Sequence, residues 1–306
     1  MTVPDATTRA TVRRAVQDWY AVHARDLPWR RPDTSAWGVL VSEVMLQQTP
    51  VSRVEPRWRE WMTRWPTPAD LAAAPTAEVL RAWDRLGYPR RALRLREAAR
   101  AISTEHAGVV PADEPTLRTL PGVGDYTAAA VAAFAYGQHA VVLDTNVRRV
   151  LARAVAGHAL PPPSPRRSEV ELAAALLPDD GAAAARFSVA VMELGALVCT
   201  ARSPECAQCP LVRQCAWVAA GRPEDEHAHR RRTQAWHGTD RQARGRVMAA
   251  LRQRDHLAAA DVVDLWPHTA QRERILAALV ADGLAAAETD DDGVPLAYRL
   301  PADEPR

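Results

Sequence analysis

The sequence contains no lysine, and all 39 of its basic residues are arginine. Its abundance of alanine, proline and arginine is typical of proteins from GC-rich genomes. The absence of lysine has a chemical consequence, because an enzyme needs an amine to form a Schiff base with its substrate. Covalent mechanisms that pass through a lysine side chain are therefore excluded.

Long hydrophobic runs are missing as well. No stretch approaches the roughly 18 consecutive apolar residues of a membrane span, and the N-terminus lacks the basic segment and apolar stretch of a signal peptide. The formal net charge is only +2, so overall charge by itself does not indicate a polyanionic partner. With 306 residues, 47% of them hydrophobic, the chain has ample material for a core. We expect a cytoplasmic protein that is monomeric and has no membrane partner.

Convincing alternating strands are scarce, whereas helical patterns separated by proline and glycine dominate. Alanine-rich amphipathic stretches recur at 92–104, 126–136, 146–155, 168–177 and 183–198. We therefore predict a mainly α fold, in which residues 1–222 form one helical domain.

The character of the sequence changes from about residue 222 to 245, where acidic residues are followed by histidines and arginines. We interpret this segment as a solvated linker. Beyond it, two stretches of helical periodicity precede a turn and a short apolar stretch, at 241–254, 270–281, 289–293 and 294–300. Helices followed by a small hairpin predict that residues 223–306 hold the linker and a small winged-helix-like domain.

All four cysteines lie in one short segment with the spacing C-x6-C-x2-C-x5-C, at Cys199, Cys206, Cys209 and Cys215. Disulfides are rare in a cytosolic chain. Four thiolates satisfy either a tetrahedral zinc ion or an iron–sulfur cubane, but zinc ribbons usually show two C-x2-C pairs and this segment has one. The spacing therefore predicts a metal site and favours an iron–sulfur cluster over zinc.

A short turn with two glycines, Leu120-Pro121-Gly122-Val123-Gly124, lies between two helical patterns. Such a turn exposes backbone N–H groups at the start of the second helix, where the helix dipole favours a phosphate. A lone G-x-G is more often an ordinary connection between helices. Spacing alone leaves both interpretations open.

Two acidic residues stand out by their positions. Glu43 lies among apolar residues on a helical pattern, in the segment SEVMLQQT, and Asp144 immediately precedes a helix, in VVLDTNV. From spacing alone, Asp144 is a helix N-cap and Glu43 is a partly buried, salt-bridged residue. The pattern alone makes neither residue catalytic.

Together these segments resemble the endonuclease III and adenine glycosylase superfamily of helix-hairpin-helix (HhH-GPD) DNA glycosylases, over about residues 20–220. The resemblance is carried by the cysteine spacing after the helix VMELGALV, by the hairpin LPGVGDYTA and by the segment SEVMLQQT. It implies a two-lobed helical fold and a [4Fe-4S] cluster in the loop 199–215. It also implies that Gly122, Val123 and Gly124 contact the DNA backbone rather than the bases.

The resemblance implies catalytic roles for individual residues. Glu43 matches the acid that protonates the purine, and Asp144 matches the catalytic aspartate of the superfamily, with Asn146 beside it. Tyr126 stands where members that also cut the strand have a lysine. Because the whole chain lacks lysine, only base removal without strand cutting remains.

Other residues match those that contact the substrate. Arg25, Trp29, Arg30 and Leu46 correspond to residues that line the pocket for the extruded base. Gln48 and Tyr88 correspond to residues that fill the gap in the duplex and wedge at the opposite base. Extrusion costs least at a mismatch, which favours mispaired sites.

The implied function is a monofunctional base-excision repair glycosylase. It would hydrolyse the N-glycosidic bond of adenine mispaired with guanine or 8-oxoguanine in double-stranded DNA, in association with the nucleoid. The alternatives are a T:G mismatch thymine glycosylase of the same superfamily and a catalytically silent iron–sulfur DNA-binding protein.

The sequence departs from the pattern at a few positions. Val189 stands where relatives commonly place a Glu or Gln that bonds to the adenine, Pro89 replaces a common second tyrosine, and Thr145 replaces a common glycine. The C-terminal region is too short for the Nudix-like domain that helps these enzymes to recognise 8-oxoguanine. These departures leave the opposite-base preference open.

Overall fold

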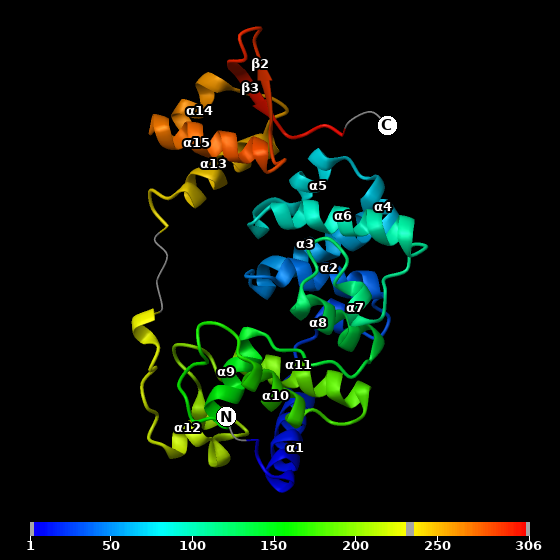
Figure 1. The fold of residues 1–306 in the computed structure, drawn as a ribbon, viewed down its shortest axis with the longest axis vertical. Coiled ribbons are helices and arrows are strands. Elements are labelled where there is room, and N and C mark those ends of the chain that lie inside the picture. The colour runs from blue at the N-terminus through cyan, green and yellow to red at the C-terminus, as the bar shows by residue number, and fades with distance from the viewer. Residues whose placement is uncertain (1–2, 231–235, 304–306) are drawn as a thin grey trace. The chain divides into compact units, whose positions relative to one another are not determined.

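The computed structural model describes residues 3–230 and 236–303, and its backbone is mostly helical (Figure 1). The chain divides into two compact units. Unit 1 comprises 1–39, 112–118 and 124–232, and unit 2 comprises 40–111, 119–123 and 233–306. The mainly α prediction is confirmed, whereas the domain boundary at residue 222 stays a prediction.

The helices of unit 1 include four at the alanine-rich stretches 126–136, 146–155, 168–177 and 183–198. The helices of this unit are α1 (Ala6–His23), α7 (Glu114–Leu117), α8 (Asp125–Tyr136), α9 (Thr145–Ala154), α10 (Arg167–Leu176), α11 (Gly181–Leu197) and α12 (Ala216–Ala219), with short 3-10 helices at η1 (Pro28–Arg30), η3 (Cys206–Gln208), η4 (Val212–Gln214) and η5 (Ala228–Arg230). Aspartates cap four of these helices at their N-termini, and each accepts a backbone N–H bond: Asp5, Asp113, Asp144 and Asp180.

The core of unit 1 lies among α1, α9, α10 and α11. Trp19 of α1 and Phe187 of α11 belong to the same buried cluster as Val150 and Leu172. Leu211, from the cysteine segment, is also part of it. The cysteine segment is therefore packed onto the helical core and does not project from it.

Unit 2 holds a second group of helices around a tryptophan cluster. These are α2 (Ala36–Leu46, which begins in unit 1), α3 (Val51–Arg64), α4 (Pro68–Ala73), α5 (Thr76–Trp83), η2 (Asp84–Leu86) and α6 (Arg90–Glu105). Trp61 and Trp83 are fully buried, with ring centroids 5.5 Å apart in an edge-to-face arrangement. The Trp61 indole N–H donates to the carbonyl of Ala82, which satisfies its one polar group.

The C-terminal part of unit 2 is a small winged-helix-like module. Its elements follow in the order α13 (Asp240–Gln253), β1 (Leu257–Ala258), α14 (Ala259–Leu265), α15 (Thr269–Ala281), β2 (Ala286–Thr289) and β3 (Pro295–Arg299). The three strands form an antiparallel sheet in the order β1-β3-β2, with Tyr298 of β3 opposite Leu257 and Ala287. Leu251, Leu257 and Leu279 are fully buried between helices and sheet.

The predicted linker is shorter than expected. α13 begins at Asp240 because the hydroxyl of Thr239 accepts the backbone N–H of Gln242 and caps the helix. Residues 231–235 of the predicted linker lie outside the described residues.

The module is packed against α5 and α6 of the same unit. Asp303 accepts bonds from the hydroxyl and N–H of Thr76 and pairs with Arg96 at 2.9 Å. Arg252 of α13 donates to the Leu80 carbonyl at 3.2 Å, and Asp282 pairs with Arg90 at 3.2 Å. These contacts attach the module to α5 and α6.

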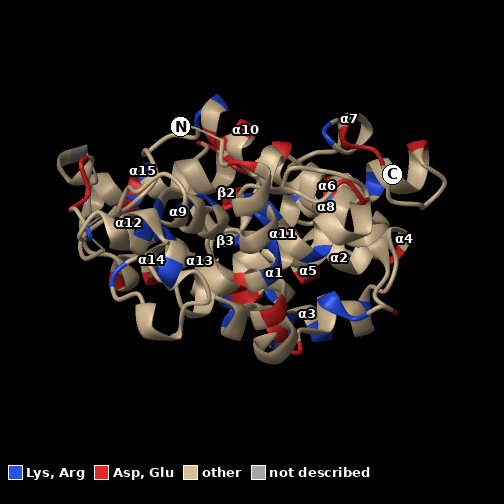
Figure 2. Ribbon diagram, turned by 90° about the horizontal axis from the view of Figure 1, so that it is seen from below, with Lys and Arg blue, Asp and Glu red and all other residues tan. Residues whose placement is uncertain are grey.

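Charged residues of both signs are interspersed along the ribbon, in keeping with the small net charge (Figure 2). Within the described residues, no helix is both long and apolar enough to cross a membrane.

Candidate active site and cysteine cluster

Asp144 caps α9 and is held there by neutral donors. Its carboxylate accepts the Val147 backbone N–H at 2.6 Å and the Asn146 side-chain N–H at 2.7 Å. Burial raises the pKa of Asp144 above its usual value, although these two bonds act in the opposite direction. The structure therefore confirms the N-cap, and it also gives the carboxylate an environment in which a negative charge is poorly solvated.

Asn146 is oriented by a residue that the sequence did not single out. Arg149 donates to the Asn146 side-chain oxygen and to the Gly195 carbonyl, both at 2.7 Å. A Cβ atom on Gly195 would lie 2.7 Å from Asn146 Cβ, so only glycine allows α11 to approach the start of α9 this closely. Arg149 and Gly195 thus position the group that hydrogen-bonds to Asp144.

The same arginine reaches the cysteine segment. Arg149 Nε donates to the Cys199 carbonyl at 2.6 Å. One helical turn later, Arg153 Nη1 lies 3.5 Å from Cys199 Sγ, and the Arg153 guanidinium lies 4.7 Å from the centroid of the Trp217 ring. A continuous set of hydrogen bonds therefore joins Asp144, through Asn146 and Arg149, to the backbone of the first cysteine.

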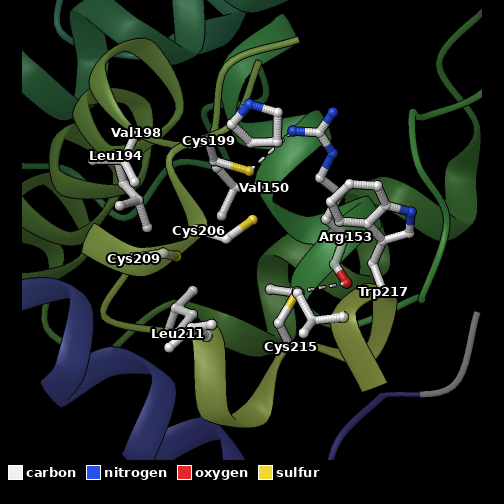
Figure 3. A pocket seen from close by; sticks show the side chains of 14 residues that line it. Val150, Arg153, Leu194, Val198, Cys199, Cys206, Cys209, Leu211, Cys215 and Trp217 are labelled. Atoms are coloured by element: carbon white, nitrogen blue, oxygen red, sulfur yellow. Dashed lines mark hydrogen bonds between the residues drawn. The ribbon is translucent and has the colours of Figure 1, made fainter. Parts of the chain in front are cut away.

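The four cysteines line one cavity, as Figure 3 shows. None of them is in a disulfide. The cavity measures about 390 Å³, part of it open to solvent, and its other walls are mostly apolar, including Val150, Leu194, Val198 and Leu211. The structure thus brings together thiols that are up to 16 residues apart in sequence.

The four thiols line one cavity and form no disulfide, which is consistent with an iron–sulfur cluster. Burial raises the pKa of Cys209 to about 11 and also raises that of Cys215, so these thiols would keep their protons at neutral pH without a metal. A metal centre supplies the positive charge that deprotonates coordinating thiols.

Glu193 of α11 is the most strongly paired carboxylate of unit 1. Its side chain is fully buried and accepts bonds from Arg25 at 2.7 Å and from Arg30 at 2.9 Å. Burial raises the pKa of Glu193, but the bonds from the two arginines outweigh this effect and hold it at about 2. Arg25 and Arg30, which the resemblance assigns to the base pocket, are in this structure the partners of Glu193.

Two other predicted residues of unit 1 differ in exposure. Trp29 of η1 is 6% exposed and lies in the core. Tyr126, on the first turn of α8, is half-buried. Both positions agree with the predicted segments, and neither by itself identifies a function.

Unit 2 carries the other predicted acid. Glu43 lies on α2, as the helical pattern predicted, and is 5% exposed among buried apolar residues. Leu46, at the last position of α2, is half-buried. The structure thus assigns Glu43 to unit 2 and Asp144 to unit 1.

Gln48 and Tyr88 are exposed, and both have left-handed backbone conformations, with φ of 56° and 45°. For residues other than glycine such conformations cost about 1–3 kcal/mol, and they persist only where the surroundings enforce them. Here the enforcing residue is Arg91. Its guanidinium donates to the carbonyls of Val44, Met45 and Gln47 on one side and of Leu86 and Gly87 on the other.

Arg91 was not identified from the sequence. Burial lowers its pKa to about 10. The five carbonyls it binds come from two segments about 40 residues apart, and nothing in a single sequence links them. Arg91 therefore holds the loop that carries Gln48 against the loop that carries Tyr88.

The glycine turn forms the predicted hairpin. The Val123 N–H donates to the Leu120 carbonyl at 3.1 Å. Gly122 has φ of 79°, and a Cβ atom on it would lie only 2.7 Å from Arg94 Cβ. α8 begins directly after the turn with Gly124 as N-cap, and no side chain caps it. The first N–H groups of α8 are thus not bound by a capping side chain.

Comparisons with known proteins agree with this arrangement. The sequence pattern of the HhH-GPD superfamily base excision DNA repair proteins matches residues 41–175. The adenine DNA glycosylase of Mycolicibacterium smegmatis is 56% identical over 275 residues, which cover 89% of this chain and 92% of that protein. The adenine DNA glycosylase of Mycobacterium tuberculosis (strain H37Rv) is 54% identical, with 89% of each chain covered.

Solved structures share the fold. A thermostable thymine-DNA glycosylase superposes with a TM-score of 0.64 at 28% identity, over 71% of this chain and all of that one. Endonuclease III in a trapped covalent intermediate with DNA superposes with a TM-score of 0.58 at 22% identity, over 70% of this chain and 99% of that one. The chain thus belongs to the HhH-GPD superfamily of base excision DNA repair proteins and, within it, to the adenine DNA glycosylases.

Proposed function

We propose that this protein is a DNA glycosylase that hydrolyses the N-glycosidic bond of adenine mispaired with guanine or 8-oxoguanine. The observation that carries the proposal is the 56% identity to an adenine DNA glycosylase across 89% of the chain. Because the proposed substrate is chromosomal DNA, we also propose that the protein acts in the cytoplasm, in association with the nucleoid.

The chemistry needs an acid and an anion. Glu43 is a buried carboxyl group on α2, and a carboxyl group can donate a proton, so it suits the role of the acid that protonates the leaving adenine. Asp144, held by Val147 and Asn146, suits the role of the anion that stabilises the oxocarbenium-like sugar. The two hydrogen-bond donors to Asp144 are neutral, and Arg149 acts on it through its charge, so the carboxylate keeps a negative charge for a developing cation.

The remaining predicted residues contact DNA in this proposal. The turn formed by Gly122, Val123 and Gly124 and the start of α8 bind a phosphate, because the N-terminal end of a helix carries partial positive charge. Exposed Gln48 and Tyr88 enter the duplex. The remaining residues are proposed to shape the surroundings of the extruded adenine. They are half-buried Leu46 and Tyr126, the core residue Trp29, and Arg25 and Arg30, which are paired with Glu193.

We propose a [4Fe-4S] cluster as the group held by Cys199, Cys206, Cys209 and Cys215. Such a cluster takes four thiolates, and the four thiols line one cavity without disulfides. The cluster would be structural, since it would join the cysteine segment to the core of unit 1. Purified aerobically, the protein should be yellow-brown and hold about four irons per chain. Stoichiometric zinc without visible absorption would contradict the proposal.

We further propose that the enzyme removes the base without cutting the strand. A lyase reaction through a side-chain Schiff base needs a lysine, and the chain has none. The abasic product should therefore stay intact until it is treated with alkali, and borohydride should trap an enzyme–DNA adduct only in minor yield, through the N-terminal amine.

A thymine glycosylase is the second candidate, because a thymine-DNA glycosylase has the same fold at 28% identity. The sequence identity is 56% over 89% of this chain for the adenine DNA glycosylase of Mycolicibacterium smegmatis, against 34% over 68% for a thymine/uracil-DNA glycosylase of Pyrobaculum aerophilum. One assay separates the candidates: purified protein is incubated with duplexes that hold A:8-oxoG, A:G or T:G, followed by alkali and a denaturing gel. Cleavage at adenine is expected, whereas cleavage at T:G alone, or none, would overturn the proposal.

A further inference from the structure

The C-terminal module contributes two side chains to the surroundings of Tyr88. The Arg241 guanidinium, at the start of α13, lies 5.0 Å from the centroid of the Tyr88 ring and 5.4 Å from that of Trp236. Arg91 lies 5.8 Å from the Tyr88 centroid and 5.1 Å from that of Trp83. Aromatic rings and guanidinium groups thus alternate from Trp83 through Tyr88 to Trp236, all within unit 2.

The outer part of this series is accessible. Tyr88 is 42% exposed and Trp236 is 48% exposed, and Arg241 is exposed as well. Large exposed aromatics are uncommon on a surface that contacts only water. Aromatic rings combined with arginine are the groups on which unpaired nucleobases stack, and the arginine adds cation–π attraction.

The module does not have the charge distribution of a separate DNA reader. The tip of its β2–β3 hairpin carries three consecutive exposed acidic residues, Asp290, Asp291 and Asp292, which would repel phosphates. The exposed side chains of α15 include Glu273 beside Arg274. The module instead brings Arg241 to Tyr88 through its attachment to α5 and α6.

We propose that Trp236, Arg241 and Tyr88 form one platform that binds the base left unpaired opposite the excised adenine. This inference rests on the proposed function in that it takes Tyr88 to enter the duplex. Arg241 and Trp236 extend the exposed surface of the Tyr88 ring, so that the three side chains contact the base together. A guanine-type base is the preferred occupant, because arginine donors match the O6 and N7 acceptors of guanine. The C-terminal module thereby takes part in reading the opposite base.

The test measures DNA binding, so that it does not depend on base release. Duplexes carry a tetrahydrofuran abasic analogue opposite 8-oxoguanine, guanine or thymine, and a fully paired duplex serves as reference. Full-length wild type, Arg241→Ala, Arg241→Lys and Trp236→Ala are compared by fluorescence anisotropy. The matched control is Arg254→Ala, which removes an exposed arginine of the same module whose partner is Asp261.

Arg241→Ala and Trp236→Ala should each weaken binding opposite 8-oxoguanine and guanine by about fivefold, the size of a cation–π contact, and leave the fully paired duplex nearly unchanged. Arg241→Lys should recover part of the loss, and in a Tyr88→Ala background Arg241→Ala should have little further effect. Equal losses on all duplexes, losses matched by Arg254→Ala, or independent effects of Arg241→Ala and Tyr88→Ala would overturn the proposal. A protein that keeps this binding preference but releases no adenine would instead contradict the proposed function alone.

Discussion

Two carboxylates of unit 1, half-buried Asp144 and fully buried Glu193, lie on neighbouring helices in opposite environments. Glu193 accepts bonds from two arginines, and its pKa is held at about 2. Asp144 accepts bonds from a backbone N–H and an amide, and burial raises its pKa. The two arginines balance the negative charge of Glu193, so this carboxylate has little effect on a developing cation. Asp144 has only neutral hydrogen-bond donors, so its charge can stabilise a cationic transition state.

The difference in hydrogen-bond partners distinguishes a structural acid, Glu193, from a candidate catalytic acid, Asp144. Removing the charge of Glu193 leaves two arginines without their partner, so stability should suffer. Removing the charge of Asp144 relieves an unfavourable burial, so stability should not suffer while chemistry does. The following changes test this contrast, from the largest expected effect to the smallest.

Asp144→Asn should lower single-turnover adenine release by at least about 100-fold, because a neutral amide cannot stabilise a developing sugar cation as a carboxylate does. Thermal unfolding should occur at the same or a slightly higher temperature, since asparagine caps a helix about as well as aspartate. The measurement pairs a quenched gel assay with a melting curve of the same preparation.

A matched change at the other candidate is Glu43→Gln, which keeps the shape of the side chain and removes the proton source. Base release should fall by about 100-fold or more, while binding to an A:8-oxoG duplex persists. An Asp144→Asn protein with intact cysteine ligation and near wild-type adenine release would leave Asp144 with its capping role only.

Glu193→Gln should reduce the free energy of unfolding by about 2 kcal/mol, less than the ~3–5 kcal/mol of a fully buried pair, because Arg25 is one third exposed. Urea unfolding monitored by circular dichroism measures the change. Arg167→Ala is the control, since its pair with Glu171 is exposed and should contribute under 1 kcal/mol. Equal stability of the Glu193 variant and the control would show that the pair is not a structural element.

Gly195→Ala should slow adenine release by about tenfold, because the added methyl group would meet Asn146 and displace the donor to Asp144. Gly245→Ala serves as the control, since a Cβ there would contact nothing within 4 Å. The assay is the single-turnover rate at saturating enzyme. Identical rates for the two variants would indicate that α9 and α11 tolerate a wider separation.

The smallest effect is the pH dependence of stability, which has opposite signs at the two acids. The lowered pKa of Glu193 means that its contribution is present above pH 4.5 and is lost as the pH falls toward 2, so the penalty of Glu193→Gln should shrink in that range. The raised pKa of Asp144 means that the folded state holds this proton more tightly than the unfolded state. Its contribution is favourable below pH 3.8 and is lost as the pH rises through the raised pKa.

Melting curves of wild type and both variants from pH 3 to 8 measure these differences. The stability advantage of Asp144→Asn should grow as the pH rises from 3.8 and then level off. The same sign of pH dependence for both variants would contradict the contrast between the two acids.

Much of the fold followed from local patterns in the sequence. The predicted helices agree with α6, α8, α9, α10 and α11 to within two residues at each end, because apolar periodicity and capping residues act over a few positions. The turn at Gly122 needs a left-handed backbone that glycine adopts readily. The hairpin prediction at 289–300 agrees with β2 and β3 for the same local reason.

Other features depend on partners far apart in the chain and were not predicted. Arg25 and Glu193 are 168 residues apart, and Arg91 joins segments separated by about 40 residues. The side chain of Arg241 reaches Tyr88 only because the module is attached to α5 and α6. No periodicity or spacing rule connects such positions in a single sequence.

The sequence by itself determined the residue types available for chemistry: no lysine for a Schiff base, four thiols for one metal site, and acids at positions 43 and 144. It also determined the helices on which they lie, because backbone propensity and capping are local. Only the tertiary structure decided that two arginines lower the pKa of Glu193 whereas burial raises the pKa of Asp144. The physical reason is that a pKa depends on desolvation and on charges brought near in space, and these are set by packing between distant segments.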